Sequence, residues 1–243
     1  MDTTNIQIVL LILVGIGGGF VQRVSGFGLG IFVMLFLPHF LPSHTMAATI
    51  SCLFSCGTST YNAVKYRKNI PYKIVLPLIL SALVTIPVAV FFSARVSSRF
   101  FEILLGAVLI FLSLYFLFLG ERIKIKASVK NSLLAGGLGG TLNGLFATGG
   151  PPIVLYMTNA LQDKIMYFAG IQFYFCITNI YATAFRFANG LVFPKVILYA
   201  AIGLVGCMLG DFSGKLVFDR LNAKMLKTII YIGMIISGVV MIF

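Results

Sequence analysis

Ionisable and metal-binding side chains are scarce in this chain. Of its 243 residues, 10% are charged, and the sequence holds only 6 Asp and Glu, 2 His and 4 Cys. These few side chains form no zinc-ligand spacing, no nucleophile and base pair and no phosphate-binding Walker loop. We therefore expect no metal, no cofactor and no enzyme active site. The cysteines all lie in apolar runs, where they pack as small apolar residues rather than forming disulfides.

Apolar residues dominate the sequence instead. They make up 59% of it, and the mean hydropathy is +1.03, far above that of soluble domains. The apolar runs are 6–24, 46–64, 74–92, 100–119, 133–146, 165–187, 196–209 and 225–243. Most approach the roughly 20 residues that cross a bilayer as a helix, and the loops are too short for a soluble domain. The sequence predicts an all-α, polytopic membrane protein surrounded by lipid. The first run lacks the basic start and cleavage site of a signal peptide, so we expect it to belong to the fold.

The net charge of +12 has two interpretations. Basic proteins bind nucleic acid, but in polytopic membrane proteins Lys and Arg gather in the cytoplasmic loops. The second interpretation accounts for the charge without a partner, so we expect no nucleic-acid binding.

The chain is predicted to be a duplication. Shifting it by about 120 residues aligns Cys56 with Cys176, Thr58 with Thr178, Tyr61 with Tyr181 and Asn69 with Asn189. Residues 95–101 and 220–226 share a further pattern, and each opens the last long apolar run of its half. We expect two transmembrane repeats, 1–123 and 124–243, within one membrane domain.

Each repeat begins with a glycine-rich segment, residues 15–38 and 135–152, which we expect to be a broken helix. Broken backbone inside a bilayer is tolerated only where protein or water satisfies it. If each segment enters the membrane and returns, three transmembrane helices follow in each repeat, and the repeats are inverted. The positive-inside rule favours this re-entrant arrangement. In this arrangement, the cations on the outer side of the membrane are only Arg95, Arg99, Arg186 and Lys195.

The two breaks are predicted to face each other and bind a small anion. A helix that begins inside the membrane has about four N–H groups without a helical acceptor and about half a positive charge at its start. Proline at 151 or 152 suits such a first turn. The candidate residues are Ser25, Gly26, Gly28, Gly30, Thr148, Gly149 and Gly150. The alternative is that the glycines only let helices pack closely, above all those at 136–140.

Arg23 places a cation inside the first apolar run. An ionisable group there costs at least ~2.5 kcal/mol unless it faces protein or water, and a guanidinium suits an oxyanion. We consider it a charge partner of the substrate, with Gln22 and Asn143 as hydrogen-bond donors. The alternatives are that Arg23 extends to the membrane interface or pairs with backbone carbonyls. Asp211 is a candidate proton-coupling site or marks the end of its helix.

Polar side chains recur at helical spacing on the second element of each repeat. The predicted substrate contacts there are Gln172 and Asn179, and the predicted cavity-lining residues are Ser55, Ser59, Asn62 and Thr183. Hydroxyl side chains in membrane helices also bond to their own backbone or to a neighbouring helix, which is the alternative.

Three motifs resemble the sulfite exporter TauE/SafE family of membrane proteins over nearly the whole chain. They are the glycine-rich start that ends in LFLPHFLP, the segment ATGGPP at 147–152, and LGDFSGKLVFDRL at 209–221. The resemblance implies a transporter, not an enzyme, that exports a small sulfur-containing anion such as sulfite or sulfoacetate across the bacterial inner membrane.

We therefore expect a secondary carrier that exports a small sulfur-containing oxyanion by alternating access around the two breaks. Two alternatives stay open. The first is membrane-embedded sulfur transfer through Cys52 or Cys56, which share a helix face. The second is an anion channel, which would show neither saturation nor counterflow. An oligomer is compatible with either.

Overall fold

The computed structural model describes residues 3–118 and 126–217, together with isolated positions between 232 and 242. The regular elements in these ranges are α1 (Thr3–Ser25), α2 (Leu29–Phe36), η1 (Leu37–His39), α3 (His44–Lys65), η2 (Arg67–Asn69), α4 (Tyr72–Ser93), α5 (Ser98–Phe118), α6 (Val129–Phe146), α7 (Gly150–Ala160), α8 (Lys164–Ala188) and α9 (Pro194–Val217). All of them are helical, as predicted. The predicted repeat pattern at 220–226 lies outside the described residues, as do several residues of the apolar run 225–243.

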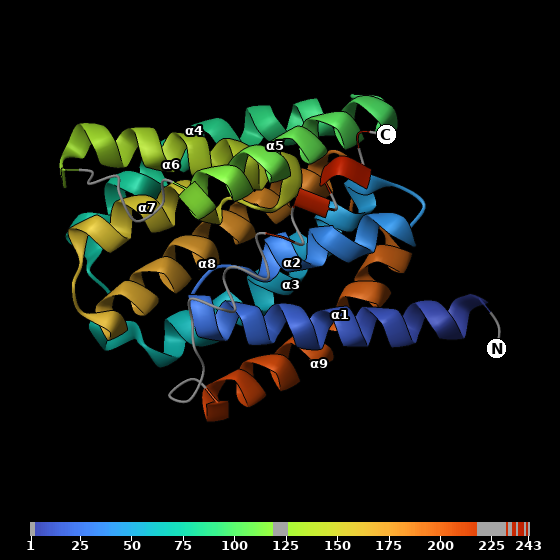
Figure 1. Cartoon of the computed structure of the whole chain (residues 1–243), viewed down its shortest axis with the longest axis horizontal. Coiled ribbons are helices and arrows are strands. Elements are labelled where there is room, and N and C mark those ends of the chain that lie inside the picture. The colour runs from blue at the N-terminus through green and yellow to red at the C-terminus, as the bar shows by residue number, and fades with distance from the viewer. Residues whose placement is uncertain are drawn as a thin grey trace.

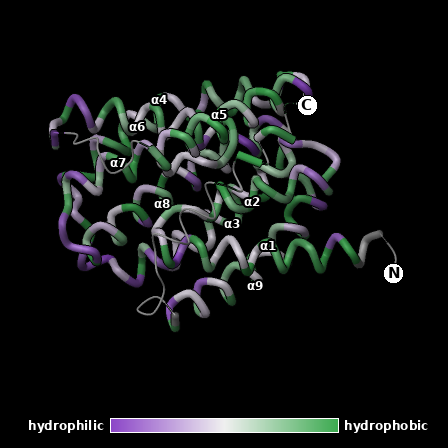
Figure 2. The backbone as a smooth tube through the Cα atoms, viewed as in Figure 1, coloured by the Kyte–Doolittle hydropathy of each residue, from purple (hydrophilic) through white to green (hydrophobic). Residues whose placement is uncertain are grey.

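Several helices have the length and composition of membrane-spanning segments. Those that meet both criteria are Ile6–Ser25, Tyr72–Ser93, Lys164–Ala188 and Pro194–Leu216. Large apolar side chains such as Val84 and Phe111 remain exposed on the outside of the bundle. Figure 2 shows hydrophobic residues along the helices and hydrophilic residues mainly at the two ends of the bundle. This distribution suits a molecule whose sides face lipid.

The helices form a bundle with α3 and α8 at its centre. These two helices pack against each other, α1 packs along α9, and α4 packs along α6. Figure 1 shows α1 and α9 on one side of the central pair and α4, α5 and α6 on the other. The first helix of each predicted repeat therefore packs on a late helix of the other repeat.

Each predicted repeat begins with a helix hairpin. In the first, Gln7 near the start of α1 donates a hydrogen bond of 3.3 Å to the carbonyl of Phe40, which follows α2. In the second, Tyr156 in α7 donates a hydrogen bond of 3.4 Å to the carbonyl of Ser128, which precedes α6. The shorter helix of each hairpin thus folds back to the end at which the longer helix begins.

The interruptions are narrower than the glycine-rich segments. Helix α1 continues through its first glycines and ends at Ser25, and α6 continues through residues 136–140. A Cβ atom at Gly15 would lie 2.3 Å from the carbonyl oxygen of Gly203, and one at Gly136 would lie 2.2 Å from that of Leu78. These glycines let α1 approach α9 and α6 approach α4, so close packing is their role and the prediction of a break does not hold for them.

The two interruptions have the same backbone conformation. Helix α1 is followed by Gly26 with φ of 86°, and α6 is followed by Ala147 with φ of 55°, both in the left-handed region. The next helices are then capped by Gly28 (φ −66°, ψ −1°) and Gly149 (φ −68°, ψ 2°). Both pairs are separated by 121 positions in the sequence. The left-handed residue ends each helix, and the capping glycine begins the next.

Candidate functional site

The two breaks lie against each other at the centre of the bundle. A Cβ atom at Gly30 would lie 2.0 Å from the carbonyl oxygen of Ala147, and one at Gly150 would lie 2.8 Å from the Phe27 ring. Only a residue without a side chain permits this approach at Gly30, because the opposing atom belongs to the backbone. The predicted meeting of the two segments is thus observed.

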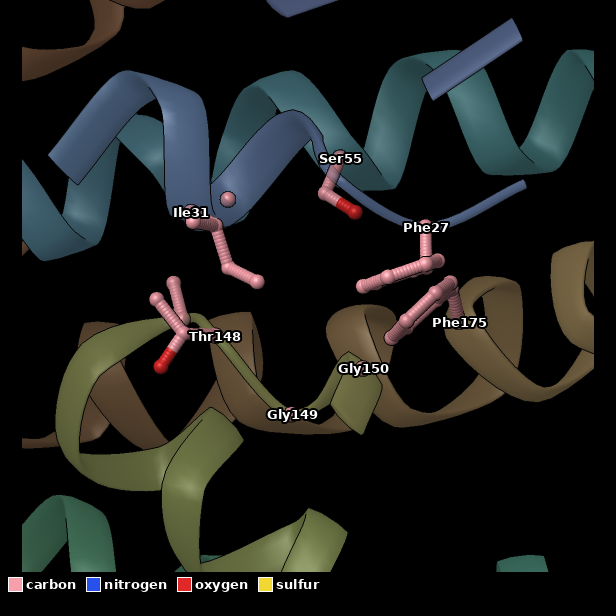
Figure 3. A pocket seen from close by; sticks show the side chains of 9 residues that line it. Phe27, Ile31, Ser55, Thr148, Gly149, Gly150 and Phe175 are labelled. Atoms are coloured by element: carbon pink, nitrogen blue, oxygen red, sulfur yellow. The ribbon is translucent and has the colours of Figure 1, made fainter. Parts of the chain in front are cut away.

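A small cavity lies between the breaks. It has a volume of about 10 Å³, and its lining residues are Phe27, Gly30, Ile31, Ser55, Ala147, Thr148, Gly149, Gly150 and Phe175. Figure 3 shows the Phe27 and Phe175 rings side by side at one end and Ile31 opposite Thr148 at the other. This volume holds about one water molecule. An anion with several oxygens therefore requires the breaks to move apart.

The starts of two helices meet at this central cavity. Helix α2 begins at Leu29 and α7 at Gly150, and residues of both first turns line the cavity. Each helix start carries roughly half a positive charge. The two differ in donors, because Pro151 and Pro152 in the first turn of α7 have no N–H group. Helix α2 therefore offers more backbone N–H groups to an anion than α7 does.

A buried chain of amide side chains supports the first break. Gln172 donates to the carbonyl of Gly26 at 2.9 Å, and Gln22 donates to the side-chain oxygen of Gln172 at 3.0 Å. Thr58 in turn donates to Gln22 at 2.9 Å. A carbonyl freed at a helix end needs such a partner inside a membrane protein. Gln22 and Gln172, predicted to bind substrate, thus hold the break and are not among the residues lining the cavity.

The second break has polar groups left over. The Asn143 amide nitrogen and the Thr148 hydroxyl are buried and have no hydrogen-bond partner among the described residues. In the first break, by contrast, the Ser25 hydroxyl accepts from the Gly28 N–H at 3.2 Å. A buried polar group without a partner is costly, so such a group points to an absent ligand or water.

Arg23 belongs to a buried polar cluster at the end of α1. It donates to the Tyr66 hydroxyl at 2.8 Å and to the Asn62 side-chain oxygen at 3.3 Å, and it lies 4.0 Å from the Asp211 carboxylate. Asn62 also donates to Asp211 at 3.1 Å. Arg23 is therefore held by protein side chains and is not among the residues that line the central cavity. Asp211 serves as its counter-charge, and Asn62, predicted to line a cavity, bridges the two.

Arg186 is a second buried cation, although the sequence predicted it among the cations on the outer side of the membrane. Helix α8 continues to Ala188, so Arg186 lies in its last turn with none of its surface exposed. It donates to the Thr49 hydroxyl at 3.2 Å and to the carbonyl of Gly144 at 2.8 Å. The missed signal was its position inside the apolar run 165–187, the same criterion that identified Arg23.

Asn179, Thr183 and Ser55 connect the surroundings of Arg186 with the central cavity, whereas Ser59 lies beyond it along α3. Asn179 donates to the Ser55 hydroxyl at 2.9 Å, and Ser55 lines the cavity. The Cys52 sulfur lies 3.6 Å from the Asn179 side-chain oxygen and 3.6 Å from the Thr183 hydroxyl. Ser59 donates to the Ser55 carbonyl within its own helix, which fits the backbone-bonding alternative.

The site contains helix starts, amides, hydroxyls and guanidinium groups. Within the described part of the chain, no group of three or more His, Cys, Asp or Glu side chains gathers. The chemistry available there is anion binding by N–H and O–H donors and fixed positive charge.

These features define a membrane transport protein, and the comparison with known families agrees. The model of the sulfite exporter TauE/SafE family matches residues 11–241, so the chain belongs to this family of exporters, which are transporters and not enzymes. The probable sulfite/organosulfonate exporter TauE of Cupriavidus necator is 24% identical over 203 residues, which are 82% of this chain and 79% of that protein. No solved structure matches the chain.

Proposed function

We propose that this protein is a secondary carrier that exports a small sulfur-containing oxyanion, of the sulfite or sulfoacetate class, across the bacterial inner membrane. The observation that supports this most is the meeting of two helix starts, α2 and α7, at one central cavity. Two partial positive charges and their N–H groups favour an anion between them. The substrate named for the Cupriavidus relative supports a sulfur-containing anion.

The fold supports an inverted-repeat, multi-pass organisation with repeats 1–123 and 124–243. The two breaks share a backbone conformation, and the pairing of α1 with α9 resembles that of α4 with α6. The two helix hairpins then enter the membrane from opposite sides. Loops 42–45 and 188–195 face outside, and the loop 65–73 faces the cytoplasm.

Alternating access follows from moving one hairpin relative to the other. The central cavity holds about one water molecule, so it is too small for an oxyanion in this conformation. Separating α2 from the rest opens a path on one side, and separating α7 opens the other. The contact between Gly30 and Ala147 closes the site in between.

The substrate oxygens are bound mainly by groups that have no other partner. These are the Thr148 hydroxyl at the cavity wall and first-turn N–H groups of α2. The Asn143 amide nitrogen joins them when the breaks separate, since Asn143 does not line the cavity in this conformation but packs against Gly149, which does. Ser55 adds a hydroxyl at the cavity wall. Arg23 contributes less charge than the sequence suggested, because Asp211 lies beside it.

The membrane potential is sufficient to drive export. An inside-negative potential contributes about 2.3 kcal/mol per charge for each 100 mV. A monovalent or divalent anion therefore leaves the cell down its electrical gradient without a coupling ion.

The test is flux through the purified protein in liposomes. Sulfite, thiosulfate, sulfoacetate, sulfate and acetate are supplied one at a time, and uptake is measured with and without unlabelled anion on the opposite side. We expect saturable flux of a sulfur-containing anion that is accelerated by counterflow. Flux without saturation or counterflow would indicate a channel, and no flux of any sulfur oxyanion would refute the proposal.

A further inference from the structure

Arg186 and Arg23 occupy corresponding places in the two predicted repeats. Tyr66, which accepts a hydrogen bond from Arg23, lies 120 positions before Arg186. Gly144, whose carbonyl accepts from Arg186, lies 121 positions after Arg23. In each repeat a guanidinium therefore spans the first helix of the hairpin and the central helix that follows it. Arg23 comes from the hairpin, whereas Arg186 comes from the central helix α8.

The two guanidinium groups differ in their counter-charge. Arg23 has the Asp211 carboxylate at 4.0 Å. Within the described ranges, no carboxylate forms an ion pair with Arg186, and its Nε atom has no hydrogen-bond partner. Its two acceptors are a neutral hydroxyl and a carbonyl in the last turn of α6, which offers roughly half a negative charge. A net positive charge therefore stays buried at this point, where an unpaired ion is costly.

A second cavity lies on the predicted outer side, separated from Arg186 by Thr49. It has a volume of about 230 Å³, and its lining residues are Pro42, Ser43, Thr45, Met46, Thr49, Gly190, Leu191, Phe193 and Lys195. Thr49 is both part of this wall and a hydrogen-bond acceptor of Arg186. On the other side, Cys52 lies beside Arg186 and contacts Asn179, which donates to Ser55 at the central cavity.

We propose that the 230 Å³ cavity is the outer vestibule of the transport path and that Arg186 is the cation that draws the oxyanion between this vestibule and the central cavity. This inference rests on the proposed function. It assigns the selection of anions over cations to Arg186 rather than to Arg23, whose charge is balanced. The observation that supports it is a buried, uncompensated charge directly behind Thr49, a residue of the cavity wall.

The first test measures the electrostatic potential in the vestibule. Thr45→Cys is introduced after the four native cysteines are replaced by serine, and its modification rates by an anionic and a cationic methanethiosulfonate of similar size are compared. We expect the modification rate by the anionic reagent, divided by that of the cationic reagent, to fall about fivefold or more in Arg186→Gln, since the nearby charge is lost. In Arg186→Lys this ratio should stay close to that of the parent. Thr49→Val, which removes the hydrogen bond but keeps the charge, should leave the ratio unchanged.

Two results would overturn the inference. One is an equal rate ratio in the parent and in Arg186→Gln. The other is failure of both reagents to modify Thr45→Cys, because the cavity would then not be an aqueous vestibule.

The second test asks whether Arg186 acts through its charge or only as a structural anchor between α8 and α6. In liposomes, Arg186→Gln should raise the KM for sulfite about tenfold, and Arg186→Lys should restore part of it. A mere anchor between α8 and α6 would lower the amount of folded protein or the maximal rate and leave KM unchanged. If the parent transports sulfite and Arg186→Gln keeps its KM, this inference fails alone; if the parent transports no sulfur oxyanion, the proposed function fails.

Discussion

The break after α1 and the break after α6 have the same backbone but different surroundings. In the first, Gln172 binds the carbonyl of Gly26 and Gln22 completes the network. In the second, Asn143 and Thr148 keep unpartnered polar groups. The shared conformation shows that a left-handed residue and a capping glycine suffice to build the break. The difference indicates that the first break is held by the protein, whereas the second has binding capacity left for a substrate.

The same contrast holds for charge. The guanidinium near the first break has a carboxylate beside it, and the guanidinium near the second has only neutral acceptors. Under the proposed function, the second repeat therefore supplies the unpartnered side chains and the uncompensated charge, whereas the first repeat contributes mainly the N–H groups of α2. Each prediction below tests one part of this contrast.

The largest effect is expected from adding a methyl group where the two breaks are in contact. In Gly30→Ala, the new methyl group would lie 2.0 Å from the Ala147 carbonyl oxygen, so the breaks must separate. Sulfite flux in liposomes should fall about tenfold or more. The matched control is Gly137→Ala, whose methyl group would meet only Thr85 at 3.8 Å, an ordinary contact. Equal flux in the two variants would show that this contact is not needed for transport.

The surroundings of the two buried guanidinium groups should contribute differently to stability. Asp211→Asn leaves Arg23 without its counter-charge and should lower the free energy of unfolding by about 3 kcal/mol. The double variant with Arg23→Gln should recover much of this loss. Arg186→Gln removes hydrogen bonds but also an uncompensated charge, and should cost less, about 1 to 2 kcal/mol. Unfolding in detergent micelles measures the three variants against the parent, and a larger loss for Arg186→Gln than for Asp211→Asn would reverse the comparison.

Replacing an amide side chain at the first break should lower stability, whereas replacing one at the second break should weaken substrate binding. Gln172→Met leaves the Gly26 carbonyl and the Gln22 amide nitrogen without partners and should cost about 1 to 3 kcal/mol of stability. Asn143→Leu removes a group whose nitrogen has no partner, so it should change stability little and raise the KM for sulfite instead. Unfolding and flux measured on both variants test this, and a loss of stability in Asn143→Leu without a change in KM would contradict it.

The smallest effect is expected from the thiols. Cys52→Ser together with Cys56→Ser keeps polar groups of similar size at both positions, so sulfite flux should stay within about twofold of the parent. Loss of all flux in a folded double variant would instead support sulfur transfer through a thiolate.

The sequence predicted the two breaks better than it predicted the packing around them. The breaks were found because glycine and proline interrupt helices, and the left-handed φ at Gly26 and the start of α7 at Gly150 bear this out. The glycines at 15–19 could not be told from a break, because their role depends on α9, which lies far away in the sequence. Arg186 was misplaced because its burial depends on how α8 packs against α3 and α6.

The most direct test of the shared central site uses the absence of tryptophan from the chain. Phe175→Trp places a single tryptophan ring at the cavity wall, and Phe111→Trp, on the outer surface, serves as the control. Sulfite should change the emission of Phe175→Trp saturably, with the half-saturating concentration of flux, and leave that of Phe111→Trp unchanged. A Phe175→Trp variant that still transports sulfite without any change in emission would contradict the proposal that the two breaks form the binding site.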